Sequence, residues 1–517
     1  MAPENTSEAA DAIRRAEQLA VAGDFAGAAD LYRAALKHHP LEPDIWNLLG
    51  LALLDGGEGD EALQCLEKAT MLAPDRAELK IGWGIALQRL GREEEAIAVY
   101  REVLDADPEN VSALTNIGVA LLTGGLVDDA LPPLEKAVAL APDDPAACAN
   151  FGVVLQRLGR TEAAIASFET ALATDPDYGE AWSGLGVALL DALELDWSRA
   201  AHERAMAIDP DNPGVHWNLA MALLLAGDYR RGFEEFEWRR KTPRLAPRTF
   251  EGPEWDGGEV EGLTVLVHVE QGIGDAIQFA RYVPLLAARG ARVAVAAHWR
   301  LAELFRTLDG AAEVVSGDDP VPDYDLQVPL LSLPRLFETD LDSIPAEVPY
   351  LAVPPGTGSP IGAKAGMSRI GLVWAGNPRH ANDRNRSCPF TELAPLIDLD
   401  GIEWVGLQVG GRAGDAAGTP VRDLSDDLTS FAVTAAAIEA LDLVISVDTA
   451  VAHLAGALAR PVWLLLPAAP DWRWLTERTD SPWYPTMRLF RQSTPGDWPG
   501  VVGALREAVA AELPGAC

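Results

Sequence analysis

The stretch that decides the fold of the second half of the chain is DLVISVDTAVAHLAGAL, residues 442–458. Its apolar run 443–447 is too short for a helix, which indicates a buried strand of a parallel sheet. Asp448 and Thr449 then offer side-chain oxygens as caps for a small-residue helix, and a second apolar run follows at 462–466. The sequence therefore predicts a strand–turn–helix–strand unit. Its helix N-terminus opens at the carboxyl edge of a sheet, where anionic ligands bind in doubly wound folds, although helix capping alone explains the same residues.

Composition narrows the possible functions. The chain has 517 residues, enough for more than one domain. Its 41 basic and 78 acidic residues give a net charge of -37, which argues against nucleic acid or an anionic membrane as the main partner. Four scattered cysteines, no apolar run of membrane-spanning length and no signal-peptide pattern predict a cytoplasmic protein without disulfides, zinc or a membrane span.

The first half of the chain repeats with a period of 34 residues. Proline recurs at Pro40, Pro74, Pro108, Pro142, Pro176 and Pro210. A small residue recurs at Ala16, Gly50, Gly84, Gly118, Gly152, Gly186 and Ala220, and a bulky one at Tyr32, Leu66, Tyr100, Leu134 and Phe168. This pattern resembles the tetratricopeptide repeat, a helix–turn–helix pair that buries its apolar face by stacking on its neighbours. We expect an α-solenoid, a superhelix of seven such repeats, over residues 9–240.

Repeat arrays of this kind present a concave surface that binds peptides or proteins. The sixth position of the repeat carries Asn116, Asn150 and Asn218, whose amides can bind a peptide backbone without reading its sequence. Ordinary polar helix positions are the alternative interpretation of these three residues. The acidity of the array favours a basic or neutral partner, although a solvated acidic face explains it as well.

The period stops after Arg239, and we interpret residues 241–262 as a linker rich in Pro, Gly and charge. Strand and helix patterns then alternate, which predicts parallel sheets. Strands are expected at 263–269, 292–296, 313–315, 325–328, 369–374, 404–408, 443–447 and 462–466, and a helix at 276–288. A Pro/Gly-rich hinge at 354–368 divides this region into two Rossmann-like lobes, 263–353 and 369–513, which we expect to face each other across a cleft.

The loop after the first strand carries Gln271, Gly272, Gly274 and Asp275. Its glycines permit close approach of the backbone to a phosphate or an acceptor. The third glycine of a nicotinamide fingerprint is missing, and Asp275 would repel a pyrophosphate at this place. Asp275 is suited to act as a general base toward an acceptor hydroxyl, and capping of the helix is the alternative.

A second polar loop, residues 374–387, follows the first strand of the second lobe. It carries Arg379, Arg384 and Arg386 in an otherwise acidic protein, so it can clamp a diphosphate opposite the helix after Asp448. A solvated loop is the alternative. His453, one turn into that helix, can reach a ligand or pack in the core.

Aromatic residues crowd one late loop. They are Trp472, Trp474, Trp483 and Tyr484, with Asp471 and Arg473 among them. These rings can stack on a nucleotide base, form the wall of a cleft, or pack the two lobes together.

Three segments resemble the heptosyltransferase-like glycosyltransferases of family 9, which have the GT-B fold: Gly274-Asp275, residues 374–377 and residues 447–455. Repeats followed by such a domain are also similar to protein O-linked N-acetylglucosamine transferases. The resemblance implies that Asp275 is the base, that the amides around Thr449, Ala450 and Val451 hold the donor diphosphate, and that Asp448 contacts the donor sugar. It implies neither a metal nor another cofactor. The chain departs from the pattern at Ala450, where the family has Gly, and at Val409, where related proteins have Lys.

We therefore expect an inverting, metal-independent glycosyltransferase that moves a sugar from a nucleotide-diphosphate donor to a protein or peptide held by the repeats. The residues expected to bind the donor are Asn377, Arg384, Arg386, Asp448, Thr449, Ala450, Val451 and His453. A non-catalytic repeat scaffold with a degenerate transferase domain is the main alternative, favoured by Val409 and Ala450. A transferase that acts on a lipopolysaccharide-type glycan is another.

Overall fold

The computed structural model describes residues 3–242, 249–317, 319–362, 366–380 and 382–513. The chain divides into two compact units. The first contains residues 1–192 and 207–209, and the second contains residues 193–206 and 210–517. The division falls inside the repeat array, earlier than residue 240, where the period of the sequence ends.

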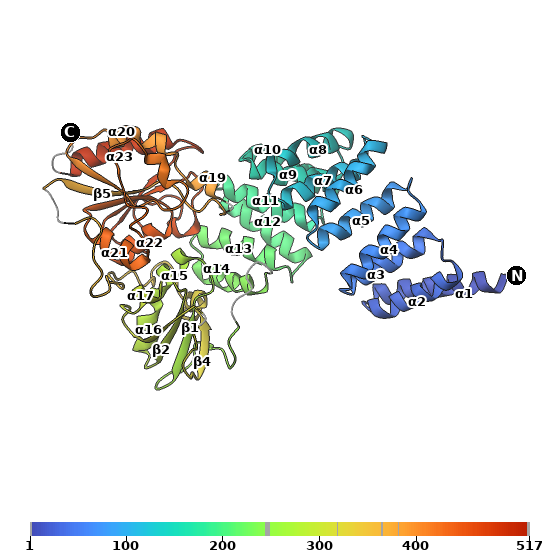
Figure 1. Ribbon diagram of the computed structural model, residues 1–517, viewed down its shortest axis with the longest axis horizontal. Coiled ribbons are helices and arrows are strands. Elements are labelled where there is room, and N and C mark those ends of the chain that lie inside the picture. The colour runs from blue at the N-terminus through green and yellow to red at the C-terminus, as the bar shows by residue number, and fades with distance from the viewer. Residues whose placement is uncertain (1–2, 243–248, 318, 363–365, 381, 514–517) are drawn as a thin grey trace. The chain divides into compact units, whose positions relative to one another are not determined.

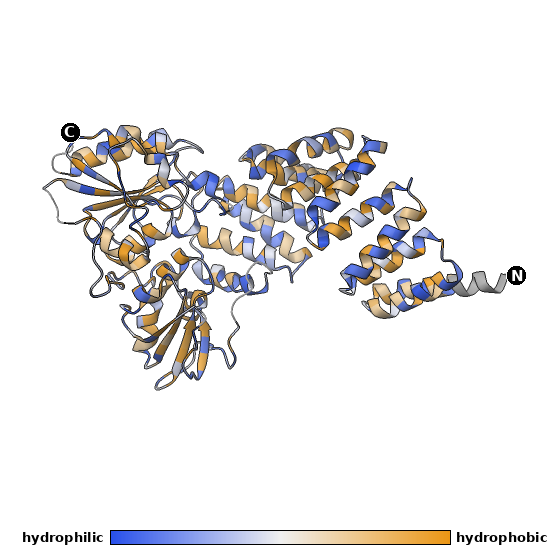
Figure 2. Cartoon of the chain, in the orientation of Figure 1, coloured by the Kyte–Doolittle hydropathy of each residue, from blue (hydrophilic) through white to orange (hydrophobic). Residues whose placement is uncertain are grey.

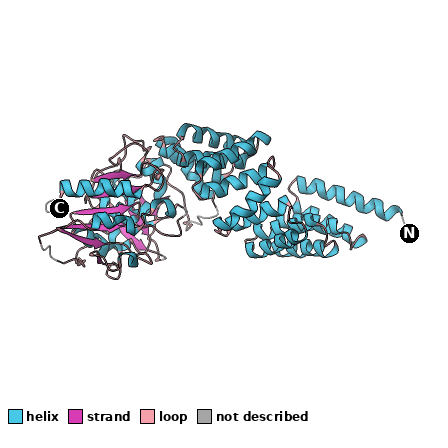
Figure 3. Ribbon diagram, turned by 90° about the horizontal axis from the view of Figure 1, so that it is seen from above, coloured by secondary structure: helices cyan, strands magenta, loops and turns pink. Residues whose placement is uncertain are grey.

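The first unit is helical throughout the residues that the structure describes (Figures 1 and 3). Its helices are α1 (Pro3–Val21), α2 (Phe25–His38), α3 (Pro43–Asp55), α4 (Gly59–Leu72), α5 (Ala77–Arg89), α6 (Glu93–Ala106), α7 (Val111–Thr123), α8 (Val127–Leu140), α9 (Pro145–Arg157), α10 (Thr161–Thr174) and α11 (Gly179–Asp191). Consecutive helices pair as hairpins, and each hairpin packs on the next. Such stacking buries an apolar face that one hairpin cannot bury alone.

The repeating glycines explain how closely the two helices of a hairpin pack. A Cβ atom added to Gly84 would lie 2.3 Å from the Tyr100 ring, and one added to Gly118 would lie 2.4 Å from Leu134. Gly50 faces Leu66 and Gly152 faces Phe168 in the same way, at 2.6 and 2.9 Å. Cβ atoms do not come this close to other heavy atoms, so glycine is required at these positions. The small and the bulky residues that recur with the period are therefore contact partners.

The second unit begins with the last helices of the array, which are α12 (Leu195–Ile208), α13 (Pro213–Leu225), α14 (Tyr229–Phe236) and the 3-10 helix η1 (Glu237–Lys241). The rings of Tyr229 and Trp483 stack with centroids 5.9 Å apart, and Phe233 meets Trp472 at 5.7 Å. These contacts join the last repeat to the α/β part of the chain. They are the physical reason why the break between the units precedes residue 240.

The predicted linker, 241–262, is described only in part, because residues 243–248 lie outside the described residues. Its later part adds to a sheet. The backbone N–H of Trp255 donates to the carbonyl of Gln327 at 2.9 Å, and Glu254 forms a parallel bridge with the same residue. This segment is therefore an extra partner for an edge strand.

The first sheet has four parallel strands in the order β3-β2-β1-β4. They are β1 (Thr264–His268), β2 (Arg292–Ala297), β3 (Ala311–Ser316) and β4 (Leu326–Pro329). The helices of this lobe are α15 (Ile273–Phe279), α16 (Val283–Ala288), α17 (Ala302–Phe305) and α18 (Leu333–Leu336), with 3-10 turns at Ala280–Tyr282 and Leu330–Ser332. The single helix predicted for 276–288 is wrong. It begins earlier, and a 3-10 turn interrupts it because Pro284 has no N–H for the carbonyl of Ala280.

The second sheet has six parallel strands in the order β10-β9-β8-β5-β6-β7. They are β5 (Ser368–Val373), β6 (Ile402–Gly406), β7 (Arg422–Asp423), β8 (Leu443–Val447), β9 (Val462–Leu466) and β10 (Met487–Arg491). Its helices include α19 (Asp383–Arg386), α20 (Ala394–Ile397), α21 (Phe431–Glu439), α22 (Ala450–Ala457) and α23 (Trp498–Glu512), with a 3-10 turn, η6, at Trp472–Trp474. Every residue of β8 and β9 is buried. Figure 2 shows orange, hydrophobic residues in the strands of both lobes. The strand prediction for 443–447 is confirmed.

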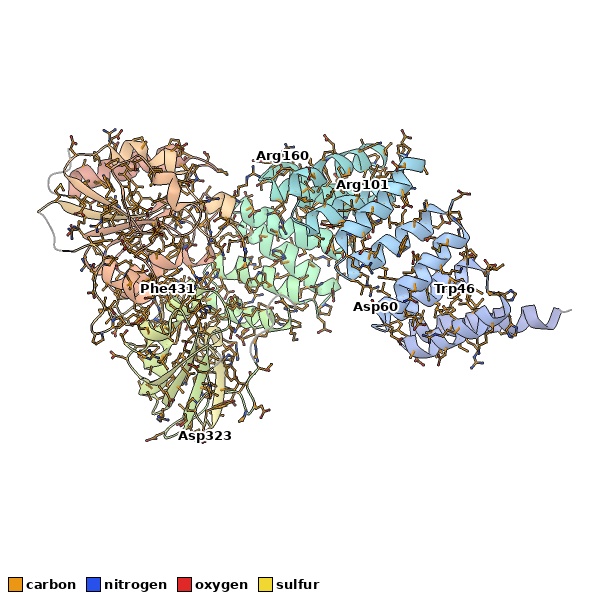
Figure 4. All side chains as sticks on the ribbon, in the orientation of Figure 1. Trp46, Asp60, Arg101, Arg160, Asp323 and Phe431 are labelled. Carbon is orange, nitrogen blue, oxygen red and sulfur yellow. The ribbon has the colours of Figure 1, made fainter. Side chains whose placement is uncertain are left out.

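Each sheet has one place where the order of its strands reverses. In the first sheet this place lies between β1 and β4, and in the second it lies between β5 and β8. The loops that leave two such strands diverge, so a crevice opens at the carboxyl edge of the sheet, where ligands of α/β proteins bind. Two candidate ligand positions follow, one in each lobe. In Figure 4, Asp323 before β4 and Phe431 at the start of α21 mark well-separated parts of the two lobes.

None of the helices in the described ranges is long and apolar enough to cross a membrane.

The hairpin packing can be tested with two glycines of one repeat. We predict that Gly118→Ala lowers the free energy of unfolding by about 1–3 kcal/mol, because its Cβ would overlap Leu134. Gly124→Ala is the matched control, since its Cβ would meet its nearest neighbour at 3.5 Å. Urea unfolding of both variants, followed by far-UV circular dichroism, measures the difference. Equal stability of the two variants would contradict this account of the period.

Candidate functional site

The loop after β8 leads into helix α22 at the reversal point of the second sheet. Thr449 is the N-cap residue of α22, but no described side chain caps this helix. The predicted capping by Asp448 and Thr449 is therefore wrong. The hydroxyl of Thr449 instead lies 3.1 Å from the hydroxyl of Ser446. Thr449, Ala450 and Val451 are partly exposed, so the amide end of the helix faces outward from the sheet edge.

Helix α15 of the first lobe packs against helix α22 of the second. A Cβ atom on Gly274 would lie 3.1 Å from Cδ2 of His453 and 3.7 Å from Cα of Ala450. Gly274 therefore lets the first turns of the two helices approach closely. This contact brings the loop of Asp275 to the loop of Asp448, from strands in different sheets.

Arg473 joins the two lobes beside Asp275. Its guanidinium forms an ion pair with the Asp275 carboxylate, donates to Asp471 at 2.8 Å, and donates through Nε to Oε1 of Gln278 at 2.5 Å. The arginine is buried. Sequence reasoning noticed Arg473 only as a neighbour of tryptophans, because nothing in the local pattern shows that it pairs with a residue 198 positions away.

The two candidate carboxylates have perturbed acidities. Burial raises the pKa of Asp275, and the positive charge of Arg473 opposes that rise. Burial also raises the pKa of Asp448 to about 6, and the negative charge of Asp471 adds to the effect. The side chains keep 26% and 15% of their surface exposed. Both carboxylates can therefore contact a ligand while remaining poorly solvated, which is typical of groups that transfer protons or bind hydroxyls.

His453 packs in the core. It is buried, its Nδ1 lies 2.9 Å from the hydroxyl of Tyr484, and its ring stacks with Trp474 at 5.5 Å. Burial lowers the pKa of His453, so the ring is neutral, and its Nε2 lies 3.7 Å from Asp448. The geometry therefore favours the packing interpretation, with His453 placed beneath the Asp448 loop.

The late aromatic loop also packs rather than lining an open surface. Trp472, Trp474, Trp483 and Tyr484 are all buried. Arg281 of the first lobe donates to the carbonyl of Trp483 at 2.6 Å and lies over the Tyr484 ring at 4.5 Å. Of the roles that the sequence leaves open for these rings, packing of the lobes is the one that the contacts favour.

The loop after β5 brings one of its arginines toward Asp448. Arg386 is mostly buried, and its positive charge helps to lower the pKa of Asp448. Its Nε is 3.6 Å from Oδ1 of Asp383, and no described residue accepts a hydrogen bond from it. Arg384, by contrast, is exposed. Of the two arginines, only Arg386 presents a buried, unused donor beside the Asp448 loop.

Two other residues of this loop have different places. The side chain of Asn377 is exposed, and its Oδ1 accepts from the backbone of Arg379 at 3.0 Å, so it holds its own turn. His380 is a residue that sequence reasoning missed. Partial desolvation lowers the pKa of His380, and the positive charge of Arg386 adds to this effect. The positive charge that His380 carries when protonated lowers the pKa of Asp275. The side chain of His380 is exposed, and its Nδ1 accepts from the backbone N–H of Asn382 at 3.2 Å, so it contacts its own loop.

The remaining predicted residues lie apart from this cluster. Gly272 is the N-cap residue of α15, and Gln271 lines a cavity at the edge of the first sheet. Asn116 and Asn150 are partly exposed, and each amide donates to its own helix at 2.8 Å. Asn218 belongs to the second unit and is also partly exposed. Their role in peptide binding stays a prediction.

Among the residues that the structure describes, no group of three or more His, Cys, Asp or Glu side chains is arranged to hold a metal ion.

Comparisons with known proteins identify the first part of the chain. Residues 13–77, 81–145 and 150–213 match the family described as tetratricopeptide repeat. The chain is similar to Protein FlbA of Caulobacter vibrioides, with 28% identity over 327 aligned residues, and the match covers 56% of this chain and 54% of that protein. The chain thus spans about half the length of this curated relative. The N-terminal part of the chain consists of tetratricopeptide repeats, as predicted.

Parts of the chain are also similar to solved structures. A thermophilic TPR protein of Thermus thermophilus has 25% identity and a TM-score of 0.32, with 35% of this chain and 99% of that chain covered. PilF of Pseudomonas aeruginosa has 20% identity and a TM-score of 0.34, with 39% of this chain and 92% of that chain covered.

The acidity of Asp448 predicts a pH-dependent stability. Because the folded protein holds the Asp448 proton more tightly than the unfolded chain, stability falls as pH rises from about 4 to about 6 and stays low above that. Asp448→Asn lacks this effect. We predict that it is more stable than the parent protein by roughly 1–3 kcal/mol at neutral pH, and that the difference vanishes near pH ~4. Melting temperatures across this pH range measure it.

Asp497→Asn is the control for this prediction, because a hydrogen bond from Ser493 lowers the pKa of Asp497. It should gain no stability at neutral pH. A pH-independent effect of Asp448→Asn would contradict the assignment.

Proposed function

We propose that the second unit is a glycosyltransferase of the GT-B type that uses a nucleotide-diphosphate sugar. The observation that carries the proposal is the meeting of three features at the β5/β8 reversal point. These are the amide end of α22, the unused buried donor of Arg386, and the partly buried carboxylate of Asp448. An N–H-rich helix end next to an arginine is suited to a diphosphate, and a carboxylate beside them is suited to sugar hydroxyls.

In this proposal, Asp275 of the first lobe is the general base. The acceptor hydroxyl attacks the anomeric carbon of the donor sugar, the bond from that carbon to the diphosphate oxygen breaks, and Asp275 takes the hydroxyl proton. The nucleoside diphosphate leaves with the bonding electron pair, and the anomeric configuration inverts. Arg386 and the amides of α22 stabilise the negative charge that develops on the diphosphate. The raised pKa of Asp275 supports its role as a base, because a carboxylate of higher pKa accepts a proton more readily.

Arg473 is a positioning residue in this scheme. Its ion pair fixes the orientation of the Asp275 carboxylate and links it to Gln278 and Asp471. The acceptor is a protein or peptide held by the tetratricopeptide repeats, where Asn116 and Asn150 occupy equivalent positions of consecutive repeats. A lipopolysaccharide-type glycan is the alternative acceptor.

A non-catalytic scaffold is the second candidate function. Val409 is 52% exposed at the carboxyl end of β6, where related transferases carry a lysine, so no cation is supplied at that position. In this case the repeats recruit a partner and the lobes serve as a structural platform.

Nucleotide binding separates the two candidates. We predict that UDP, ADP or GDP, or one of their sugar conjugates, raises the melting temperature of the intact protein, since a ligand that binds the native state stabilises it by mass action. Arg386→Ala should abolish the shift. Arg384→Ala should reduce it less, because Arg384 is exposed. Arg506→Ala, an exposed arginine on α23, should leave it unchanged. The absence of a shift with every nucleotide would favour the scaffold instead.

A further inference from the structure

A cavity of about 110 Å³ lies at the reversal point of the first sheet. It is lined by His268 at the end of β1 and Glu270 after it, by Gln327 and Pro329 of β4, and by Arg240 of η1. This is the position where ligands bind in α/β sheets, and the donor cluster of the second lobe occupies the equivalent place in its own sheet. At about 30 Å³ per water molecule, this volume holds roughly four waters, so a small ring-shaped molecule enters it in part.

Two polar atoms beside this cavity have no partner among the described residues. One is Oε2 of Glu270, whose side chain is only 6% exposed, and the other is Nε2 of Gln271. The first lacks a donor and the second lacks an acceptor. A buried polar atom without a hydrogen bond costs free energy, so a ligand that satisfies both atoms gains affinity. A hydroxyl group can do this, because it donates and accepts. Neither atom is open to water, so binding includes a small rotation of these side chains.

The charged residues of the cavity are already neutralised. Arg239 donates to Glu270 at 2.7 Å, to Glu237 at 2.6 Å and to Ser332 at 2.9 Å. Arg240 forms an ion pair with Glu254. Among the described lining residues, two arginines and two glutamates thus balance in charge, and both of these arginines are already paired with carboxylates.

Two rings, Phe250 and His268, also line the cavity. The rings of Phe250 and His268 lie 4.7 Å apart, and His268 is fixed by Gln327 Oε1 at 2.8 Å from its Nε2. Burial lowers the pKa of His268 to about 4, so this ring is neutral near pH 7. A cavity lined by uncharged aromatic rings and by hydrogen-bonding groups is suited to a ring that has an apolar C–H face and hydroxyls at its edge.

We propose that this cavity is a binding site for a neutral monosaccharide, either free or at the end of a glycan. Glu270 accepts from one sugar hydroxyl, Gln271 donates to another oxygen, and the C–H face of the ring lies against Phe250. Sugar binding at this site does not require sugar transfer at Asp275. The two proposals can therefore be tested separately. In a protein with a partner-binding repeat array, such a site recognises a sugar that the partner already carries.

Saturation-transfer NMR on the intact protein tests this site. The probes are the methyl glycosides of glucose, galactose and mannose, N-acetylglucosamine, and agmatine as a cation. We expect transfer to at least one sugar and none to agmatine. Phe250→Ala and Gln271→Leu should each weaken the binding of that sugar by about tenfold, the loss expected for one contact of this kind.

Trp299→Ala is the matched control, because Trp299 is an aromatic residue of the same lobe that is 62% exposed and does not line the cavity. It should leave sugar binding unchanged. Melting temperatures of the variants confirm that they are folded, and Gln271→Leu decides the result if Phe250→Ala is unstable. Three results would each overturn the proposal. They are no saturation transfer to any sugar, saturation transfer to agmatine alone, and sugar binding that only Trp299→Ala removes.

Discussion

The candidate site of the second unit depends on one interaction, the ion pair between the buried guanidinium of Arg473 and the carboxylate of Asp275. The arginine comes from a loop of the second lobe and pairs with Asp275 at the first turn of α15 in the first lobe. Losing one partner of a buried ion pair costs about 3–5 kcal/mol, because the other charge is left without compensation. The pair therefore holds the lobes in register, together with Gly274, which allows α15 to touch α22. Asp275 and Asp448 are brought together by these contacts, although 173 residues separate them in the chain.

The sequence predicts much of the fold because local physical rules decide it. The 34-residue period is visible in the sequence because the same contact between helices recurs in each repeat. Position 84 must be a small residue because Tyr100 packs on it, and position 118 must be small because Leu134 packs on it. Strand β8 is visible because a strand buried on both faces is continuously apolar. Strand β10 is less visible, since its sequence Met-Arg-Leu-Phe-Arg interrupts the apolar run with two arginines. The break in the helix after Phe279 follows from Pro284, a local signal that the prediction of one continuous helix overlooked.

The candidate site was predictable in its loops but not in its contacts. Asp275, Arg386 and Asp448 lie in the segments that follow predicted strands, which is why a single sequence could select them. The partner of Asp275, Arg473, depends on how the two lobes meet, and no spacing in the sequence encodes that contact. For the same reason, the sequence does not decide whether His453 and Trp474 bind a ligand or pack in the core. Only their burial in the folded structure separates these two roles. The two lobes have one feature in common: in each of them, polar groups gather at the place where the strand order of the sheet reverses.

The most direct test of this account is the release of nucleoside diphosphate from a nucleotide sugar, measured for the intact protein and for Asp275→Asn with a cell extract as the source of acceptor. The donor is the one that raises the melting temperature. The account predicts turnover by the parent protein and a loss of about 100-fold or more in the variant, while the variant keeps its nucleotide-induced stabilisation. Equal turnover by the two proteins would contradict the role of Asp275. Absence of turnover by the parent protein, despite nucleotide binding, would contradict the proposed transferase itself.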